Sequence, residues 1–441
     1  MMRFSRTLWL LALVALPAAR IARAQDTTYR GITINGVYDP TRDKYTVVVL
    51  PVTGAFGDSI QTIVKRDLDF SDHFTLTPID STDPSALKNA GSAAGLNYPL
   101  FQHLGVQAIV QMTIVPTGLH VALHDVTRGA VVNVKEFALA GNPLSRDWRL
   151  SIHQVSDEVT RWVTGQRGIA ATRIAYLRGG SIRVIDSDGA SEITLPTEPN
   201  AMSPAWNPAA TMIAYSTYAV NSRIVLMDLA TGQSHTLVGP TRNTSYTTPV
   251  FTPDGSRVVY TRAGETESDL YAVGVSGGPR QRLTAGSRGV EESLPTVSPD
   301  GRRIVFVSNA LGRPELYIMD SDGTNADVLT NYDFSEKNYR TDPDWSPDGR
   351  LIAYAERIND RFQIRTIPIT GGTPKQLTSD GENEQPSWAP DGRHLVFTSS
   401  RTGVRQLWIL DTESNRVRQL TKSAGSRLPA WSARLGAGGA N

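Results

Sequence analysis

One phrase, close to P-x-W-S-P-D-G, returns along the second half of the chain at a nearly constant spacing. Its six copies are separated by 45, 46, 48, 43 and 43 residues. After each copy except the last come two strand-like stretches, a Gly- or Asn-containing turn and a last short strand. A unit of about four strands that repeats every ~40–50 residues is typical of a β-propeller blade. The copies begin at Pro204, Pro249, Pro295, Pro343, Pro386 and Pro429.

The two ends of the repeat region are incomplete in complementary ways. Residues 172–196 have the last three strands of a unit without the phrase before them, and residues 428–435 have the phrase with no strands after it. Together they make one blade. The sequence therefore predicts a six-bladed propeller in which strands from both ends of the region share a blade, an arrangement that leaves no open sheet edge.

The region before the repeats follows different patterns. Residues 45–52 form an apolar run typical of a strand covered on both faces. Residues 145–165 predict a helix that begins after the cap Ser145 and ends at Gly165. The fold class is therefore mainly β, a propeller preceded by a small α+β domain. The predicted divisions are a signal peptide 1–24, an α+β domain 25–167, a propeller 168–434 and a flexible tail 435–441.

The first residues resemble an export signal. Arg3 and Arg6 precede an apolar stretch, Thr7–Pro17, that is too short to span a bilayer, and Ala22 and Ala24 fit a cleavage site. We expect cleavage near Ala24 and a periplasmic location; the alternative is an uncleaved membrane anchor. The chain has no cysteine. Disulfides, thiolate metal sites and cysteine nucleophiles are therefore excluded.

Charge argues against nucleic-acid and membrane partners. The chain has 44 basic side chains, of which four arginines lie in residues 1–24, so 40 remain against 43 acidic ones after cleavage. Binding to phosphates requires clustered Lys and Arg, which a nearly neutral chain lacks. We expect no nucleic-acid binding, no direct membrane insertion and a monomer.

Several motifs suggest chemistry but fit turns better. In S-P-D-G, Pro sets φ, Ser and Asp cap turn amides, and Gly accepts positive φ. The G-x-S-x-G match at 274–278 lies between two strands, not at the strand-to-helix turn that a nucleophile elbow needs. The D-S-D-G stretches at 186–189 and 320–323 lack the later ligands of a calcium loop. The histidines are scattered. We therefore predict no catalytic residue, no metal and no cofactor, and assign the repeated tryptophans to packing between blades.

Loops that precede each anchor proline vary in sequence, and in a propeller such loops line one mouth of the central channel. Loop variation on a rigid scaffold commonly carries function. The candidate residues of this mouth are all charged: Glu291, Glu292, Arg340, Asp342, Glu382, Glu384 and Arg427.

An export signal, a small α+β domain and a six-bladed propeller closing on L-P-A-W-S together resemble the TolB family of the bacterial Tol–Pal system. The resemblance implies binding, not catalysis. It implies that a Pal-like lipoprotein binds at the channel mouth, with Ser245, Thr248 and Ser293 among the contacts. It also implies that the mature N-terminus binds a TolA-like inner-membrane protein and that the system supports outer-membrane integrity and cell division. The N-terminal contacts would be Gln25, Asp26, Thr27, Thr28 and Tyr29.

Two other readings stay open. One is a propeller hydrolase or lactonase that uses channel acids and a metal. The other is a glycan-binding propeller.

Overall fold

The structure, a computed structural model, describes residues 44–78, 95–218, 222–330 and 338–436. Residues 45–441 group into one compact unit by their contacts. Strands dominate the described residues of this unit, which form one five-stranded sheet and six four-stranded sheets. The predicted fold class is confirmed.

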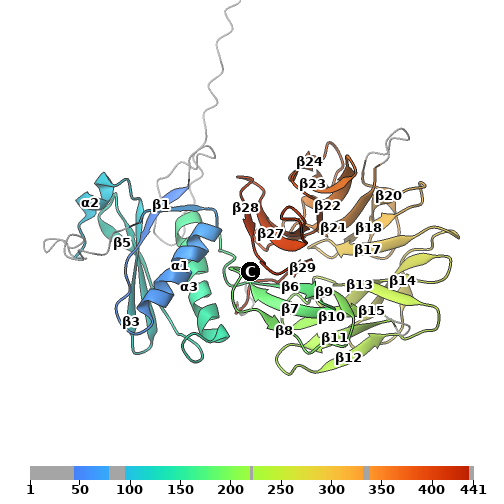
Figure 1. Ribbon diagram of the computed structural model, residues 1–441, viewed down its shortest axis with the longest axis horizontal. Helices are drawn as coiled ribbons and strands as arrows, with labels where there is room; N and C mark the ends of the chain where they lie inside the picture. Colours follow the sequence, from blue (N-terminus) through green and yellow to red (C-terminus); the bar gives the residue numbers. More distant parts are fainter. Residues whose placement is uncertain (1–43, 79–94, 219–221, 331–337, 437–441) are drawn as a thin grey trace, which may run out of the picture. The chain divides into compact units, whose positions relative to one another are not determined.

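The five-stranded sheet has the order β2-β1-β3-β4-β5, with β1 parallel to β2 and β3. Figure 1 shows α1 and α3 side by side against one face. Alternate residues of β1 enter two apolar cores, Val47 on the side of α1 and α3 and Val48 on the side of α2. The prediction of a strand covered on both faces is therefore confirmed. The elements are β1 Tyr45–Val49, α1 Gly57–Phe70, β2 Phe74–Leu76, α2 Tyr98–His103, β3 Ala108–Val115, β4 Gly118–Asp125, β5 Ala130–Phe137 and α3 Arg146–Thr164.

Helix α3 begins and ends where the sequence predicts. The Ser145 hydroxyl accepts the amide proton of Trp148, with 3.3 Å between Oγ and N, and Gly165 follows the helix with φ +79°. A hydroxyl cap satisfies a free amide of the first turn, and glycine takes the left-handed conformation at little cost.

The six four-stranded sheets are the blades, and the innermost strand of each contacts the innermost strand of the next around a closed ring. The first blade combines both ends of the region. The other five are continuous in sequence. The innermost strands are β9 Ala201–Trp206, β13 Ser245–Phe251, β17 Glu292–Val297, β21 Arg340–Trp345, β25 Asn383–Trp388 and β29 Arg427–Trp431.

The next three strands of the blades complete each sheet. The second strands are β6 Arg173–Arg178, β10 Met212–Thr217, β14 Arg257–Ala263, β18 Arg303–Ser308, β22 Leu351–Ile358 and β26 His394–Ser399. The third strands are β7 Ser181–Asp186, β11 Arg223–Asp228, β15 Ser268–Gly274, β19 Glu315–Asp320, β23 Arg361–Pro368 and β27 Gln406–Asp411. The outermost strands are short: β8 Ile193–Thr194, β12 Ser234–Val238, β16 Gln281–Arg282, β20 Asp327–Val328, β24 Lys375–Gln376 and β28 Val417–Gln419.

The shared blade closes as predicted. Its order is β29-β6-β7-β8, so a strand from near the end of the chain forms the inner edge of a sheet that begins at Arg173. Figure 1 shows β29 beside β6. Antiparallel pairing joins Trp431 to Ile174. The ring is thereby closed by backbone hydrogen bonds, not by packing alone.

The repeated S-P-D-G phrase forms a turn between the first two strands of a blade. The Ser346 hydroxyl accepts the amide proton of Leu351 at 2.9 Å, and the Asp348 carboxylate accepts that of Arg350 at 3.1 Å. Gly349 has φ +74°. In the divergent copy, Asn207 accepts two amide protons at 2.8 Å and Ala210 takes the left-handed position with φ +53°. The turn interpretation is confirmed.

The repeated tryptophans lie between blades, as predicted. Trp345 packs with Val305 of the preceding blade and Tyr354 of its own. Trp388 and Trp431 occupy equivalent cores farther along the ring. The G-x-S-x-G match at 274–278 is likewise the turn between β15 and β16, so it is no nucleophile elbow.

Candidate functional site

The six innermost strands share an unusual backbone feature directly before the anchor proline. In every blade the register of the innermost strand shifts at this point, which marks a β-bulge. The residue before the proline has φ between +48° and +58° in all six copies. Side chains other than glycine adopt this conformation rarely, and it costs about 1–2 kcal/mol per residue. The six residues are Ser203, Thr248, Leu294, Asp342, Gln385 and Leu428.

Because the six innermost strands share one topology, their first residues lie at one end of the ring and define the predicted mouth. A bulge re-aims the neighbouring side chains and ends regular pairing, which is common near binding sites. Here the bulge residues are also fixed by hydrogen bonds. The Gln385 side-chain oxygen accepts the Leu428 amide proton and the Thr398 hydroxyl proton, both at 2.9 Å. Thr248 and Thr261 join through their hydroxyls at 2.8 Å.

Two acids at the mouth titrate unusually. Burial, and then the nearby Glu384 carboxylate, raise the pKa of Asp342 to about 7. Burial also raises the pKa of Glu384, although Arg405 lies 3.1 Å from its carboxylate and opposes the shift. Like charges that share a partly buried site disfavour double ionisation. This side of the mouth therefore changes charge near neutral pH.

The other predicted mouth residues differ in access. Ser245 and Arg427 are exposed at the beginnings of β13 and β29, whereas Thr248, Glu292 and Ser293 are partly buried. Burial raises the pKa of Glu292.

The structure corrects the prediction that Arg340 is presented at the channel mouth. Its guanidinium is buried, pairs with Glu315 and lies 2.9 Å from Glu356, the residue opposite it in the sheet. Arg340 thus belongs to an internal ion-pair network and is not presented to a partner. Strand alternation would place Arg340 and Asp342 on one face, but the bulge between Thr341 and Asp344 breaks the alternation.

The predicted N-terminal contacts, residues 25–29, lie outside the described part of the chain. They stay a prediction.

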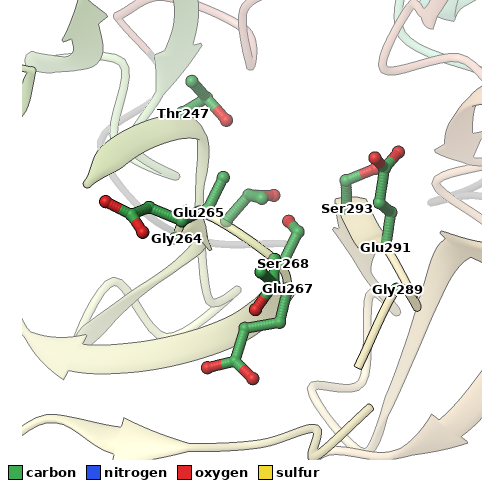
Figure 2. A pocket seen from close by; sticks show the side chains of 11 residues that line it. Thr247, Gly264, Glu265, Glu267, Ser268, Gly289, Glu291 and Ser293 are labelled. Carbon is green, nitrogen blue, oxygen red and sulfur yellow. The ribbon is translucent and has the colours of Figure 1, made fainter. Parts of the chain in front are cut away.

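A cavity of about 380 Å³ opens at the mouth end, between the blade of β13–β16 and the blade of β17–β20. Figure 2 shows Glu265 and Glu267 on the side of one blade and Glu291 and Ser293 on the side of the next. Glu265 accepts a hydrogen bond from Asn243 at 2.6 Å. Three carboxylates around a polar cavity suit a cationic side chain. Glu265 and Glu267 were not predicted from the sequence. Two acids within the five residues 264–268 were the signal that could have identified them.

Two groups of described residues bring a histidine and two carboxylates together, Asp67–His153–Asp188 and Asp72–His394–Asp411. Arginines already hold at least one acid of each group. Arg149 lies 2.6 Å from Asp188, and Arg393 contacts both oxygens of Asp411 at 2.7 and 2.6 Å. A divalent cation would have to displace these guanidiniums, so neither group is arranged for a metal. The scattered histidines gave no sign of this clustering in the sequence.

The turn 186–189 also does more than predicted. Its geometry is a hairpin turn, yet Asp186 and Asp188 are buried and meet arginines of α1, α3 and β6. Burial alone would raise the pKa of Asp188, but His153, Arg66 and Arg149 together hold that pKa below its usual value.

Among the helices of the described residues, none has both the length and the apolar character needed to cross a membrane.

Comparisons with known proteins agree with this geometry. Residues 161–435 match the family model described as the TolB beta propeller domain. The Tol-Pal system protein TolB of Gluconobacter oxydans (strain 621H) is 29% identical over 290 residues, which cover 62% of this chain and 59% of that protein. Its counterpart from Actinobacillus succinogenes is 34% identical over 201 residues, 42% of this chain and 46% of that protein.

The crystal structure of TolB from Acinetobacter baumannii is similar with a TM-score of 0.75 and 25% identity, covering 89% of this chain and 97% of that one. The matched segments span only about half of the curated relatives, 59% and 46% in the two above. These relatives are named as components of a protein system and not as enzymes, in agreement with the prediction of a non-catalytic protein.

Proposed function

The chain belongs to the TolB propeller family, and on this premise we propose that it is a periplasmic protein–protein interaction scaffold of a Tol–Pal system. It binds a Pal-like lipoprotein at the channel mouth and a TolA-like inner-membrane protein through its N-terminal region. By these contacts it supports outer-membrane integrity and constriction during division. The family match over the whole propeller is the observation that carries the proposal.

The mouth supports the choice of binding surface. Six strained bulge residues hold the rim in fixed positions, so a partner meets a surface that needs little reordering on binding. The exposed Ser245 and Arg427, the partly buried Thr248, Glu292 and Ser293, and the acids Asp342 and Glu384 make this rim polar. We leave Arg340 out of the contact set because it is buried.

The acidic cavity suggests how a partner is oriented. Glu265, Glu267 and Glu291 would receive a lysine or arginine of the Pal-like protein, while the neighbouring Ser293 contacts its backbone. Opposite charges across an interface contribute to partner choice and association rate more than to affinity.

The remaining parts of the proposal concern export and the N-terminus. Residues 1–24 would direct export and be removed, which leaves residues 25–29 at the mature N-terminus for a TolA-like partner. The proposed domains after cleavage are residues 25–167, 168–434 and a tail 435–441.

The test uses the mature chain from Gln25 and the soluble domain of the Pal-like lipoprotein from the same organism. We expect binding by calorimetry, and we expect Ser245→Arg to weaken it about tenfold or more, since a bulky side chain at an interface centre disrupts packing. Ser234→Arg is the matched control, because Ser234 is also an exposed serine but lies on the outermost strand β12.

A second arm separates the two partners. Deletion of residues 25–29 should abolish binding of a TolA-like soluble domain and leave binding of the Pal-like protein unchanged. No binding of the Pal-like protein by folded chain at micromolar concentration would refute the proposed partner. Equal effects of Ser245→Arg and Ser234→Arg would refute the mouth as its site.

A further inference from the structure

The turn after α1 meets the blade of β25–β28 through a dense group of charges. Arg416, between β27 and β28, contacts Asp69 at 2.9 Å and Asp72 at 3.0 Å. Arg393, just before β26, donates to the backbone oxygen of Asp72 at 3.4 Å. This contact joins the α+β region to a single blade far along the chain.

His394 lies at the centre of this group and is 1% exposed. Its Nδ1 lies 2.7 Å from the Asp391 carboxylate, and its Nε2 lies 3.3 Å from the Asp72 carboxylate. An ionised carboxylate only accepts hydrogen bonds, so both ring nitrogens must donate. A histidine that donates from both nitrogens is an imidazolium.

The surrounding charges favour that form. Five carboxylates from three parts of the chain belong to this group, and four guanidiniums partly balance them; the fourth is Arg434, whose charge acts on Asp391. Asp69 and Asp72 come from the end of α1, Asp391 from the turn before β26, and Asp411 and Glu413 from the end of β27; the other guanidiniums are Arg393, Arg416 and Arg418. The neighbouring His73 stays neutral, because burial and then Arg393 lower its pKa to about 4.

A proton explains the group better than a metal ion does. Arg393 occupies both oxygens of Asp411, and Arg416 occupies the Asp72 oxygen that His394 does not face. One further positive charge is still needed among these carboxylates, and the imidazolium supplies it without displacing a guanidinium.

We propose that His394 is a proton-dependent latch that fastens the turn after α1 to the blade of β25–β28. With both nitrogens protonated, the ring bridges Asp391 of the blade and Asp72 of the turn. When one proton leaves, one ring nitrogen becomes an acceptor facing a carboxylate, and the bridge is replaced by repulsion. The latch is closed in acid and neutral solution and opens in alkaline solution.

The pKa shift agrees in sign. Burial lowers the pKa of His394, but Asp391 and Asp72 outweigh burial and raise it from 6.5 to about 9. The folded state thus holds this proton more tightly than the unfolded state. Its stabilising contribution is complete below about pH 6.5 and disappears as the pH rises through about 9.

Hydrogen exchange on the full mature chain tests the latch. Amide protection of a peptide covering residues 68–76 is measured by mass spectrometry at pH 6.5, 8 and 9.5, with labelling times scaled to equal intrinsic exchange. We expect protection to fall about tenfold between pH 6.5 and 9.5 in the unmodified protein, because a buried repulsive pair replaces a bridge. Nitrogen chemical shifts of labelled histidine should show His394 charged at pH 7.

His394→Gln should give low protection at every pH, since glutamine carries no positive charge and both its N–H donors lie on one nitrogen, whereas the two carboxylates face different ring nitrogens of His394. His235→Gln is the control, an exposed histidine on β12, and should behave as the unmodified protein. If His394→Gln fails to fold, Asp72→Asn serves instead and should remove most of the pH dependence. A neutral His394 at pH 7, or protection in the unmodified protein that does not change with pH, would overturn the proposal.

Discussion

Asp344 illustrates how one side chain links neighbouring blades. It lies between the anchor proline and tryptophan, and its carboxylate accepts the amide proton of Trp388 in the next blade at 2.7 Å. Thr296 and Ser387 occupy the same repeat position and accept the equivalent amide protons at 3.3 and 3.1 Å. A hydroxyl therefore performs the same task as the carboxylate, without a charge to bury.

Because the Asp344 carboxylate is buried, its ionised form lowers the free energy of unfolding, and this effect depends on pH. Burial raises its pKa from 3.8 to about 7, although the Trp388 amide opposes the shift. A raised folded-state pKa favours folding at low pH, and this contribution is lost as the pH rises through about 7. Asp344→Ser should therefore increase the free energy of unfolding by about 1–3 kcal/mol at pH 8 and give no increase at pH 4.

Urea denaturation at both pH values measures this difference. Asp58→Ser, at an exposed acid in the first turn of α1, is the control and should show no comparable dependence on pH. A loss of stability at pH 8 equal to that at pH 4 would mean that ionised Asp344 costs the fold nothing.

At the scale of elements, the turn between the first two strands of a blade was predictable because its geometry is local. Pro, Asp and Gly each have a backbone reason to stand where they do, and four of the five continuous blades carry all three. The bulge one strand earlier was not predictable. Side chains as different as Leu294, Asp342 and Gln385 occupy its left-handed position, so no residue type signals it.

The turn between β21 and β22 allows a direct measurement of how much the local turn conformation contributes to the free energy of unfolding. Gly349 has φ +74°, and an added methyl group would come no closer than 3.9 Å to Pro299. The cost of Gly349→Ala is therefore conformational, and we expect a loss of about 1–2 kcal/mol in the free energy of unfolding. Gly264→Ala is the control, since Gly264 lacks a positive φ and has space around it.

Chemical denaturation of both variants separates the cost of the left-handed turn conformation from the general effect of replacing glycine with alanine. The control should change stability by less than about 0.5 kcal/mol or increase it slightly, because alanine reduces the entropy of the unfolded chain. Equal losses in the two variants would show that the turn conformation is not what Gly349 provides.

At the scale of the molecule, the sequence predicts the ring of blades but not the contacts that join the α+β region to it. The period, the blade count and the shared blade follow from spacing alone, because each blade repeats one local pattern. The ion pairs that join α1 and the turn after it to the blades connect residues more than a hundred positions apart, such as Arg66 with Asp188 and Asp72 with His394. No local pattern marks such pairs.

The sequence predicts where the mouth lies, but it does not predict which of the mouth residues are buried. Topology places the beginnings of six equivalent strands at one end, so the repeat alone identifies the region. Burial within it depends on the bulges and on neighbouring blades, and Arg340 was misassigned for that reason.

Closure of the ring by β29 leads to the last prediction. Truncation after Ser426 removes the inner strand of the shared blade and the Arg434 side chain, which donates to the backbone oxygens of Gly168 and Arg167 at 2.7 and 2.9 Å. Strand β6 would then present an unpaired edge on an open ring, which favours pairing between copies. We expect loss of the cooperative thermal transition and soluble oligomers in size-exclusion chromatography. Removal of residues 437–441 alone should change neither.

A peptide spanning residues 426–435 provides the sharper half of this experiment. It contains β29 and Arg434, so it should restore a monomer and the cooperative transition when added to the truncated chain. The same peptide with Trp431→Ala should fail, because Trp431 is buried between blades and its indole nitrogen donates to the Thr172 hydroxyl at 2.8 Å. Replacing a buried tryptophan with alanine costs about 3–5 kcal/mol. A truncated chain that remains a cooperative monomer without peptide would show that five intact blades hold the ring closed by themselves.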